Sequence, residues 1–291
     1  MRIDEMFKNN DVTVSLEAFP PKTESSFEPV LRAVDELSAC KPDYMSVTYG
    51  AGGGTSKNTL EIASYIQQEL HTTALAHLSC VSSSRAEIST IIDELKAKGI
   101  VNVLALRGDI PEGMAFPDAG YYSFAYQLVE EIMSRGGFCV GAACYPEGHI
   151  ECANKADDMD YLKAKVDSGC DFLVTQMFFD NNVLYSFLYN ALRKGIHVPV
   201  TAGVMPVTNS RQIKRICDMA GTSLTPKFKT IVDKFGDNPE ALKQAGIAYA
   251  TDQIVDLIAN GVKGIHIYTM NKPDVAQKIM TNLSDILNVS R

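Results

Sequence analysis

The sequence repeats one order of features along its whole length: an apolar run, an amphipathic segment and a glycine. Several of the apolar runs show almost no polar alternation, which is typical of parallel strands buried on both faces. A glycine, which readily adopts the left-handed conformation that ends a helix, precedes the next run in five places: Gly99, Gly136, Gly169, Gly195 and Gly261. The eight runs are Val12–Phe19, Tyr44–Tyr49, Thr73–Cys80, Asn102–Leu106, Phe138–Cys144, Phe172–Phe178, Val198–Met205 and Gly264–Thr269.

This order is that of consecutive βαβ units, and eight of them predict an α/β fold of the closed (β/α)8 type, a TIM barrel. A doubly wound open sheet is the alternative, but the chain has no G-x-G-x-x-G followed about 20 residues later by an acidic residue. The longest interval between runs, Pro206 to Lys263, contains extra helical segments around 211–220, 226–234 and 239–260. We expect residues 1–291 to form a single domain.

The charge balance argues against two classes of partner. Lys and Arg number 27 and Asp and Glu number 35, for a formal net charge of -8, which disfavours nucleic acid and anionic membranes.

No apolar run approaches the roughly 18 residues of a membrane span, and Met1 to Asn10 is polar, so we expect a cytoplasmic protein. The seven scattered cysteines include no C-x-x-C pair, and we expect reduced thiols and no metal.

Polar residues stand late in seven of the eight runs or directly after them. In a (β/α)8 barrel the active site lies at the C-terminal ends of the strands, so these side chains are expected to share one pocket. They are Glu17, Thr48, Tyr49, His77, Arg107, Asp109, Tyr145, Glu147, His149, Gln176, His266 and Tyr268.

Glu17 is the strongest candidate for a catalytic group. It lies in the apolar segment Val14-Ser-Leu-Glu-Ala-Phe, where desolvation is expected to raise the pKa of a carboxyl, as suits a general acid. The alternative is a structural ion pair with an Arg or Lys across the barrel. His77, His149 and His266 lack the spacing of a metal site, which favours hydrogen bonding to a ligand or to the backbone.

Other segments give weaker signals. The glycine-rich loop from Gly50 to Lys57 lacks the spacing of a P-loop. Lys163 and Lys165, on the helix after the fifth run, suit either a solvated face or an anionic ligand. No lysine stands late in a strand, which disfavours Schiff-base chemistry.

Seven segments at the strand ends together resemble the 5,10-methylenetetrahydrofolate reductase family. The similarity runs in order from about Val14 to Asn271. The segments are Glu17-Ala-Phe-Pro-Pro-Lys-Thr, Ser46-Val-Thr-Tyr-Gly-Ala, His77-Leu-Ser-Cys, Leu106-Arg-Gly-Asp, Ala143-Cys-Tyr-Pro-Glu-Gly-His, Thr175-Gln-Met-Phe-Phe-Asp and Gly203-Val-Met-Pro-Val. The resemblance implies a catalytic barrel that carries FAD and reduces 5,10-methylenetetrahydrofolate to 5-methyltetrahydrofolate with NADH or NADPH.

The resemblance also implies roles for residues. Glu17 would be the proton donor, and Asp109 would contact both flavin and pterin. Thr48 and Gln176 would serve the nicotinamide and folate half-reactions in turn, in a ping-pong scheme. The positions that match the cofactor site are Thr48, Tyr49, Ala51, His77, Arg107, Gly108, Asp109, Ala125, Tyr145, His149, Asp158 and Lys165. The positions that match the folate site are Asp109, Gln176, Gln212 and Lys272.

The sequence departs from the family pattern at three positions. Lys272 stands where many members have Arg, and Tyr161 and Ala164 stand where many have amide or basic side chains. The regulatory domain of larger eukaryotic members is absent from the sequence, so inhibition by S-adenosylmethionine through it is not expected. Expected partners are a folate and further copies of the chain. The alternative function is a folate- and flavin-binding subunit that receives electrons from a partner protein.

Overall fold

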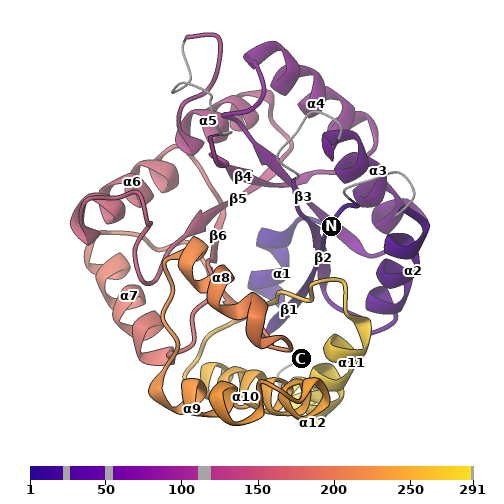
Figure 1. The fold of residues 1–291 in the computed structure, drawn as a ribbon. Helices are drawn as coiled ribbons and strands as arrows, with labels where there is room; N and C mark the ends of the chain where they lie inside the picture. The colour runs from indigo at the N-terminus through magenta and orange to yellow at the C-terminus, as the bar shows by residue number, and fades with distance from the viewer. Residues whose placement is uncertain (22–26, 50–54, 111–118, 290–291) are drawn as a thin grey trace.

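The computed structural model describes residues 1–21, 27–49, 55–110 and 119–289, and these residues fold into a closed barrel of eight parallel strands surrounded by helices (Figure 1). Each strand pairs with its sequence neighbours, and β1 pairs with β8 to close the barrel. The strands are β1 (Thr13–Ala18), β2 (Tyr44–Val47), β3 (Thr73–Ser79), β4 (Asn102–Leu106), β5 (Cys139–Cys144), β6 (Phe172–Thr175), β7 (Val200–Val204) and β8 (Gly264–Ile267).

The helices follow the strands in alternation, with one additional helix before β1, two between β7 and β8 and one at the C-terminal end after α11. They are α1 (Ile3–Asn9), α2 (Phe27–Ser38), α3 (Thr55–Gln68), α4 (Arg85–Ala97), α5 (Ala125–Arg135), α6 (Lys155–Asp167), α7 (Asn181–Arg193), α8 (Ser210–Ala220), α9 (Pro226–Phe235), α10 (Pro239–Ala259), α11 (Pro273–Asn282) and α12 (Ser284–Val289).

The predicted (β/α)8 architecture is confirmed, and each strand lies within one of the eight apolar runs. The five glycines that precede strands all have positive φ, between 66° and 105°. The three extra helical segments after the seventh run are α8, α9 and α10.

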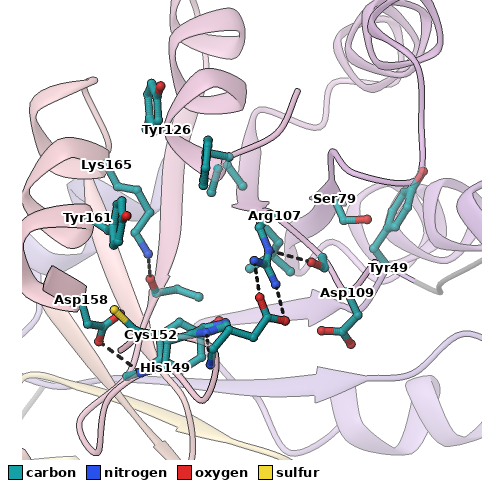
Figure 2. Close-up of a pocket in the computed structure, with 18 of the residues that line it drawn as sticks. Tyr49, Ser79, Arg107, Asp109, Tyr126, His149, Cys152, Asp158, Tyr161 and Lys165 are labelled. Atoms are coloured by element: carbon teal, nitrogen blue, oxygen red, sulfur yellow. Dashed lines mark hydrogen bonds and ion pairs between the residues drawn. The ribbon is translucent and has the colours of Figure 1, made fainter. Parts of the chain in front are cut away.

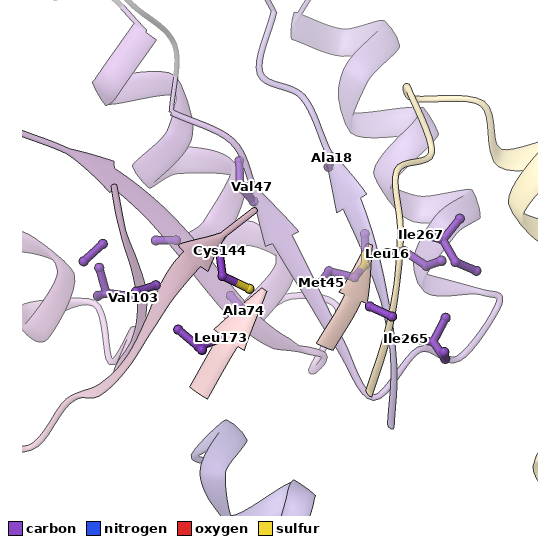
Figure 3. Packing of buried hydrophobic residues seen from close by; sticks show 14 of the residues in the cluster. Leu16, Ala18, Met45, Val47, Ala74, Val103, Cys144, Leu173, Ile265 and Ile267 are labelled. Atoms are coloured by element: carbon purple, nitrogen blue, oxygen red, sulfur yellow. The ribbon is translucent and has the colours of Figure 1, made fainter. Parts of the chain in front are cut away.

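Alternation along the strands divides the core into two environments. Outward-facing residues of β1, β2 and β8 pack against the helices, as Figure 3 shows for Leu16, Met45 and Ile265. The residues between them point into the barrel, where Glu17 and His266 line a cavity. Because side chains alternate along a strand, the same runs that build the packed shell also place polar groups inside the barrel.

Helix α1 closes the end of the barrel at which the strands begin, and the sequence patterns did not predict it. The helix buries Ile3, Met6 and Phe7 against the barrel interior near the N-terminal ends of the strands. The ring centroids of Phe7 and Phe172 are 5.7 Å apart. Burial of each such side chain stabilises the fold by about 1.5–3 kcal/mol. With this end plugged, the polar cavities lie toward the opposite, C-terminal end.

The segment between β7 and β8 forms a separate small core. Ile213 and Cys217 on α8 pack with Phe228 on α9 in a cluster beside the barrel. Helix α10 approaches this segment closely at Gly246, where an added Cβ would lie 1.8 Å from the carbonyl oxygen of Val207. Only glycine permits this approach, so α10 fixes the path of the chain between β7 and α8.

Candidate active site

Two adjoining cavities lie at the C-terminal ends of the strands. The outer cavity has a volume of about 430 Å³ and the inner one about 290 Å³. Four residues line both: Tyr49, Leu106, Ala143 and Tyr145. The predicted residues that line the inner cavity are Glu17, Thr48, Tyr49, His77, Tyr145, Gln176, His266 and Tyr268. Those that line the outer cavity are Tyr49, Arg107, Gly108, Asp109, Ala125, Tyr145, His149, Asp158 and Lys165.

Glu17 is buried in the inner cavity between two histidines. Its Oε2 atom lies 3.5 Å from His266 Nε2 and 3.8 Å from His77 Nε2. His266 Nδ1 is in turn 2.8 Å from the hydroxyl of Ser15, its partner in the β1–β8 register. Among the described residues no Arg or Lys forms an ion pair with Glu17, so the structure does not contain the structural pair considered as an alternative.

His77 is neutral at physiological pH. Burial lowers the pKa of its imidazole to about 4, because desolvation penalises the charged form more than the nearby Glu17 carboxylate favours it. Its Nε2 atom is buried and has no hydrogen-bond partner in the described part of the chain. A buried polar atom without a partner is costly, and one that lines a cavity indicates a place for a ligand group.

Arg107 carries the cationic character of the outer cavity (Figure 2). Its Nη1 and Nη2 atoms donate to the two carboxylate oxygens of Glu151 at 2.6 and 2.8 Å, and its Nε donates to the carbonyl of Gly108 at 3.1 Å. These hydrogen bonds raise the pKa of Arg107 and lower that of Glu151. Arg107 is therefore a fixed cation within the cavity wall.

Lys165 supplies a second positive group to the same cavity. Its ammonium donates to the backbone carbonyl of Ala143, and burial lowers its pKa. Nearby, the carboxylate of Asp158 accepts from the backbone N–H of His149 at 3.3 Å, and burial raises its pKa. The His149 ring packs edge-on against Tyr145 at 4.6 Å. Cation, carboxylate and aromatic rings thus share one wall.

Aromatic rings form one end of the outer cavity. Phe124 lies nearly parallel to Tyr161, with centroids 6.3 Å apart and planes at 9°, and also stacks with Tyr126 at 5.9 Å. Tyr161 is 56% exposed although it lines the cavity. In Figure 2, Tyr126 and Tyr161 lie on one side of Arg107, and Tyr49 and Asp109 lie on the other.

Several predicted residues lie elsewhere. Gln212 is on α8, and the Lys272 ammonium donates to the Thr208 hydroxyl at 2.6 Å; neither residue lines the two cavities. Ala51 falls outside the described residues. The carboxylate of Glu147 accepts from the backbone N–H of Ser223, before α9, so it ties two loops together outside both cavities.

Three features of the site were not identified in the sequence. They are the Glu17–His266 contact, the Arg107–Glu151 ion pair and the aromatic end formed by Phe124 and Tyr161. The position of His266 late in the last apolar run, together with the β1–β8 pairing of a closed barrel, is the signal that places it beside Glu17. In the described part of the chain, no cluster of three His, Cys, Asp or Glu side chains could hold a metal, and no helix could cross a membrane.

Comparison with known sequences gives one consistent family. Residues 2–284 match the family described as methylenetetrahydrofolate reductase. The chain is 35% identical over 295 residues to methylenetetrahydrofolate reductase (NADH) 1 of Arabidopsis thaliana, covering 97% of this chain and 50% of that protein. It is 33% identical over 272 residues to 5,10-methylenetetrahydrofolate reductase of Escherichia coli K12, covering 94% and 90%. The chain therefore spans about half of the plant relative and most of the bacterial one.

Solved structures share the fold at low sequence identity. A Clostridium thermocellum protein that binds two copies of 5-methyl-5,6,7,8-tetrahydrofolic acid superposes with a TM-score of 0.67 at 13% identity, covering 99% of each chain. Dihydropteroate synthase from Xanthomonas albilineans superposes with a TM-score of 0.54 at 13% identity, covering 94% and 92%. At this identity the similarity indicates the barrel alone.

Proposed function

The chain belongs to the methylenetetrahydrofolate reductase family, and from this membership we propose that it reduces 5,10-methylenetetrahydrofolate to 5-methyltetrahydrofolate. We further propose FAD as its cofactor and NADH or NADPH as its electron donor. Residues 1–291 would act as a single catalytic domain. The curated relatives named for this activity support the proposal, including bacterial proteins of similar length.

The observation that carries the proposal is the junction of the two cavities. The outer cavity offers cations and aromatic rings, and the inner one offers a buried carboxyl group. Tyr49 and Tyr145 line both, so a ligand in the outer cavity would reach the mouth of the inner one. This arrangement suits a large anionic aromatic cofactor next to a substrate that needs a proton.

The residues of the outer cavity fit FAD. Arg107 and Lys165 would face its phosphates, since both are held in the wall by hydrogen bonds. The unpartnered Nε2 atom of His77 and the side chains of Thr48 and Asp109 would contact the flavin. When bound, FAD supplies the two-electron carrier that a nicotinamide reduces and a folate oxidises.

Glu17 is placed to supply the proton. Opening the methylene-bridged ring requires protonation of the departing nitrogen, which leaves a 5-iminium cation whose carbon then accepts a hydride. The Glu17 carboxyl is 3% exposed and lines the inner cavity together with Gln176. A buried acid next to a hydrogen-bonding amide can protonate the substrate and hold it without competition from bulk water. The Nε2 atom of His266 lies 3.5 Å from this carboxyl group.

Asp109 would act through its charge. It is exposed at the rim of the outer cavity, directly after Arg107-Gly108 at the end of β4. A carboxylate at the flavin would disfavour extra negative charge on the reduced ring and so favour transfer of the hydride to folate. Gln212 and Lys272, which match folate-site positions of the family but line neither cavity, would contact the folate.

The test is an assay of purified protein. The expected results are a flavin absorption spectrum, oxidation of NADH or NADPH with menadione as acceptor, and reduction of methylenetetrahydrofolate. A flavin that is reduced only after a second protein is added would favour the electron-transfer subunit. A purified protein that binds neither flavin nor folate would contradict both functions.

A further inference from the structure

The two oxygens of the Glu17 carboxyl group have different surroundings. Oε2 is the oxygen nearer to both histidines, at 3.5 Å from His266 Nε2 and 3.8 Å from His77 Nε2. All three side chains are buried and line the inner cavity. Oε1 is therefore the oxygen that is left for a substrate.

Ser15 bears on which ring nitrogen of His266 carries a proton. Its hydroxyl lies 2.8 Å from Nδ1 of His266 and 3.3 Å from the carbonyl oxygen of Ile265. A serine hydroxyl has one proton to donate, and Nδ1 is the closer of its two acceptors. When Nδ1 accepts this proton, a neutral imidazole carries its own proton on Nε2, the atom that faces Oε2 of Glu17.

The inner cavity offers no cation to a Glu17 carboxylate, because no Arg or Lys of the described residues lines it. Burial lowers the pKa of His77 to about 4, and it raises the pKa of Tyr145 to about 12. The ring of Tyr268, whose pKa burial also raises, packs edge-on against His266 with centroids 4.9 Å apart. The titratable groups that lie on the strands around the pair, or directly after them, are Tyr44, Tyr49, His77, Tyr145 and Tyr268.

We propose that His266, held by Ser15, is a positioning residue for the general acid: its Nε2–H donates to Oε2 of Glu17, so that the acidic proton lies on Oε1 and faces the substrate. The inference rests on the proposed function, because it assigns a role in the same proton transfer. The proton passes from Oε1 to the departing nitrogen of the substrate as the bond from that nitrogen to the methylene carbon breaks. His266 keeps its own proton throughout.

The contact from Nε2 strengthens as the reaction proceeds. Negative charge grows on the carboxyl group while Oε1 gives up its proton, and a hydrogen bond to a charged acceptor is stronger than one to a neutral acceptor. The separation of 3.5 Å is longer than a hydrogen bond. Catalytic hydrogen bonds are often long in a ligand-free site and shorten when the substrate binds.

A neutral donor suits this position better than a cation would. Arg or Lys in place of His266 would favour the carboxylate of Glu17 so strongly that the acid would be ionised before the substrate arrives. Without any donor, the buried carboxylate formed by proton transfer would bear the cost of desolvation alone. A neutral imidazole stabilises the charge as it forms.

The experiment follows the two half-reactions separately in purified, flavin-loaded protein. Stopped-flow absorbance records reduction of the flavin by NADH and reoxidation of the reduced flavin by methylenetetrahydrofolate. His266→Leu should slow reoxidation by folate about 10- to 100-fold, the range of one hydrogen bond to a charged group. Reduction by NADH should stay close to that of the unaltered protein. His266→Gln supplies an amide N–H and should recover part of the rate.

The pH dependence of the folate half-reaction distinguishes this role from a structural one. The rate should fall at high pH, where the general acid is ionised. Without the Nε2–H donor the carboxylate is less favoured, so in His266→Leu the fall should move to higher pH by about one unit. Loosening of the barrel would slow both half-reactions and leave the position of the fall unchanged.

Ser15→Ala tests the second member of the pair. It removes the hydroxyl at Nδ1, so the ring adopts either tautomer, and the folate half-reaction should slow about threefold to tenfold. The matched control is Thr201→Val. It removes another buried hydroxyl, on β7, which lines neither cavity and has no hydrogen-bond partner in the described part of the chain. The control should keep both rates and the pH profile.

An unchanged folate half-reaction and pH profile in His266→Leu would overturn the inference and leave the proposed reductase intact. Equal losses in Ser15→Ala and Thr201→Val would overturn it as well. Should His266→Leu fail to bind flavin, His266→Gln and Ser15→Ala carry the same test, and equal slowing of both half-reactions in them would show a structural role. An unaltered protein that does not reduce methylenetetrahydrofolate would instead count against the proposed function.

Discussion

The Nε2 atom of His266 lies 3.5 Å from the Oε2 atom of Glu17, inside the barrel and across the seam at which β1 meets β8. The ring is held from its other side by Ser15, whose hydroxyl lies 2.8 Å from Nδ1. All three side chains are buried. The His266 ring is therefore held in place beside the proposed proton donor before any substrate binds.

Glu17→Gln should separate the two half-reactions. The amide keeps the shape of the side chain but cannot donate the proton, so we expect folate reduction to fall by about 10²- to 10⁴-fold. Flavin content and NADH oxidation with menadione should stay close to those of the unaltered protein. Both activities are measured on one preparation, and unchanged folate turnover would remove Glu17 from the mechanism.

Asp109→Asn should raise the midpoint potential of the bound flavin. Removal of a negative charge favours the reduced cofactor, and we expect a rise on the order of 30 mV, which for a two-electron couple corresponds to about 1.4 kcal/mol. Folate reduction should slow more than NADH oxidation. A spectroelectrochemical titration measures the potential, and a lower value in the variant would contradict the electrostatic role.

Tyr161→Ala should weaken FAD binding while leaving FMN binding unchanged. Tyr161 and Phe124 form the aromatic end of the outer cavity, beyond the cations Arg107 and Lys165, where an adenine ring would lie. One aromatic contact contributes about 0.5–1.5 kcal/mol, so we expect a loss of roughly twofold to tenfold. Dissociation constants come from flavin fluorescence.

Two further variants control this measurement. Tyr161→Phe should retain the affinity for FAD, because the ring is kept. Tyr189→Ala removes a comparably exposed tyrosine, 63% against 56%, from α7 outside both cavities and should have no effect. Equal losses for FAD and FMN in Tyr161→Ala would place the contact at the flavin end instead.

His77 should make the protein less stable as the pH falls. Its pKa is about 4 in the folded protein and about 6.5 in the unfolded chain, so between these values the unfolded state binds more protons. The free energy of unfolding should therefore decrease from pH 6.5 to pH 4, with about 3 kcal/mol attributable to this group.

Urea unfolding of the flavin-free protein at several pH values, with His77→Gln alongside, measures this contribution. The variant cannot protonate at this position, so its stability should decline less steeply over the same range. Carboxylates titrate in both proteins and cancel in the comparison. Parallel stability curves would show that His77 is not the titrating group.

The barrel could be predicted from the sequence because its signals are local. Apolar runs such as Asn102–Leu106 indicate strands, and the glycines after helices indicate where the helices end. Eight repeats of this order are compatible with few chain topologies. Helix α1 was missed because seven residues of mixed polarity carry little periodicity. Its burial depends on Leu75, Leu104 and Phe172, which come together only when the barrel closes.

The candidate site was partly predictable for a related reason. Parallel strands bring their C-terminal ends to one face, so His77, Arg107 and Gln176 could be grouped from their positions alone. The specific partners of these side chains could not be predicted. Glu151 contacts Arg107 from a loop, and Tyr161 contacts Phe124 from a neighbouring helix. No local sequence pattern indicates that either pair is close in space.

The absence of a side chain at Gly246 has a consequence beyond packing. The helix that contains it touches the Val207 carbonyl, and Val207 belongs to the connection that leads into the segment with Gln212. A methyl group there would push this connection outward and displace the folate-facing surface as a unit. Substrate affinity would then fall although every ligand-binding side chain was still present in the sequence. Positions outside the cavity lining therefore also control substrate affinity.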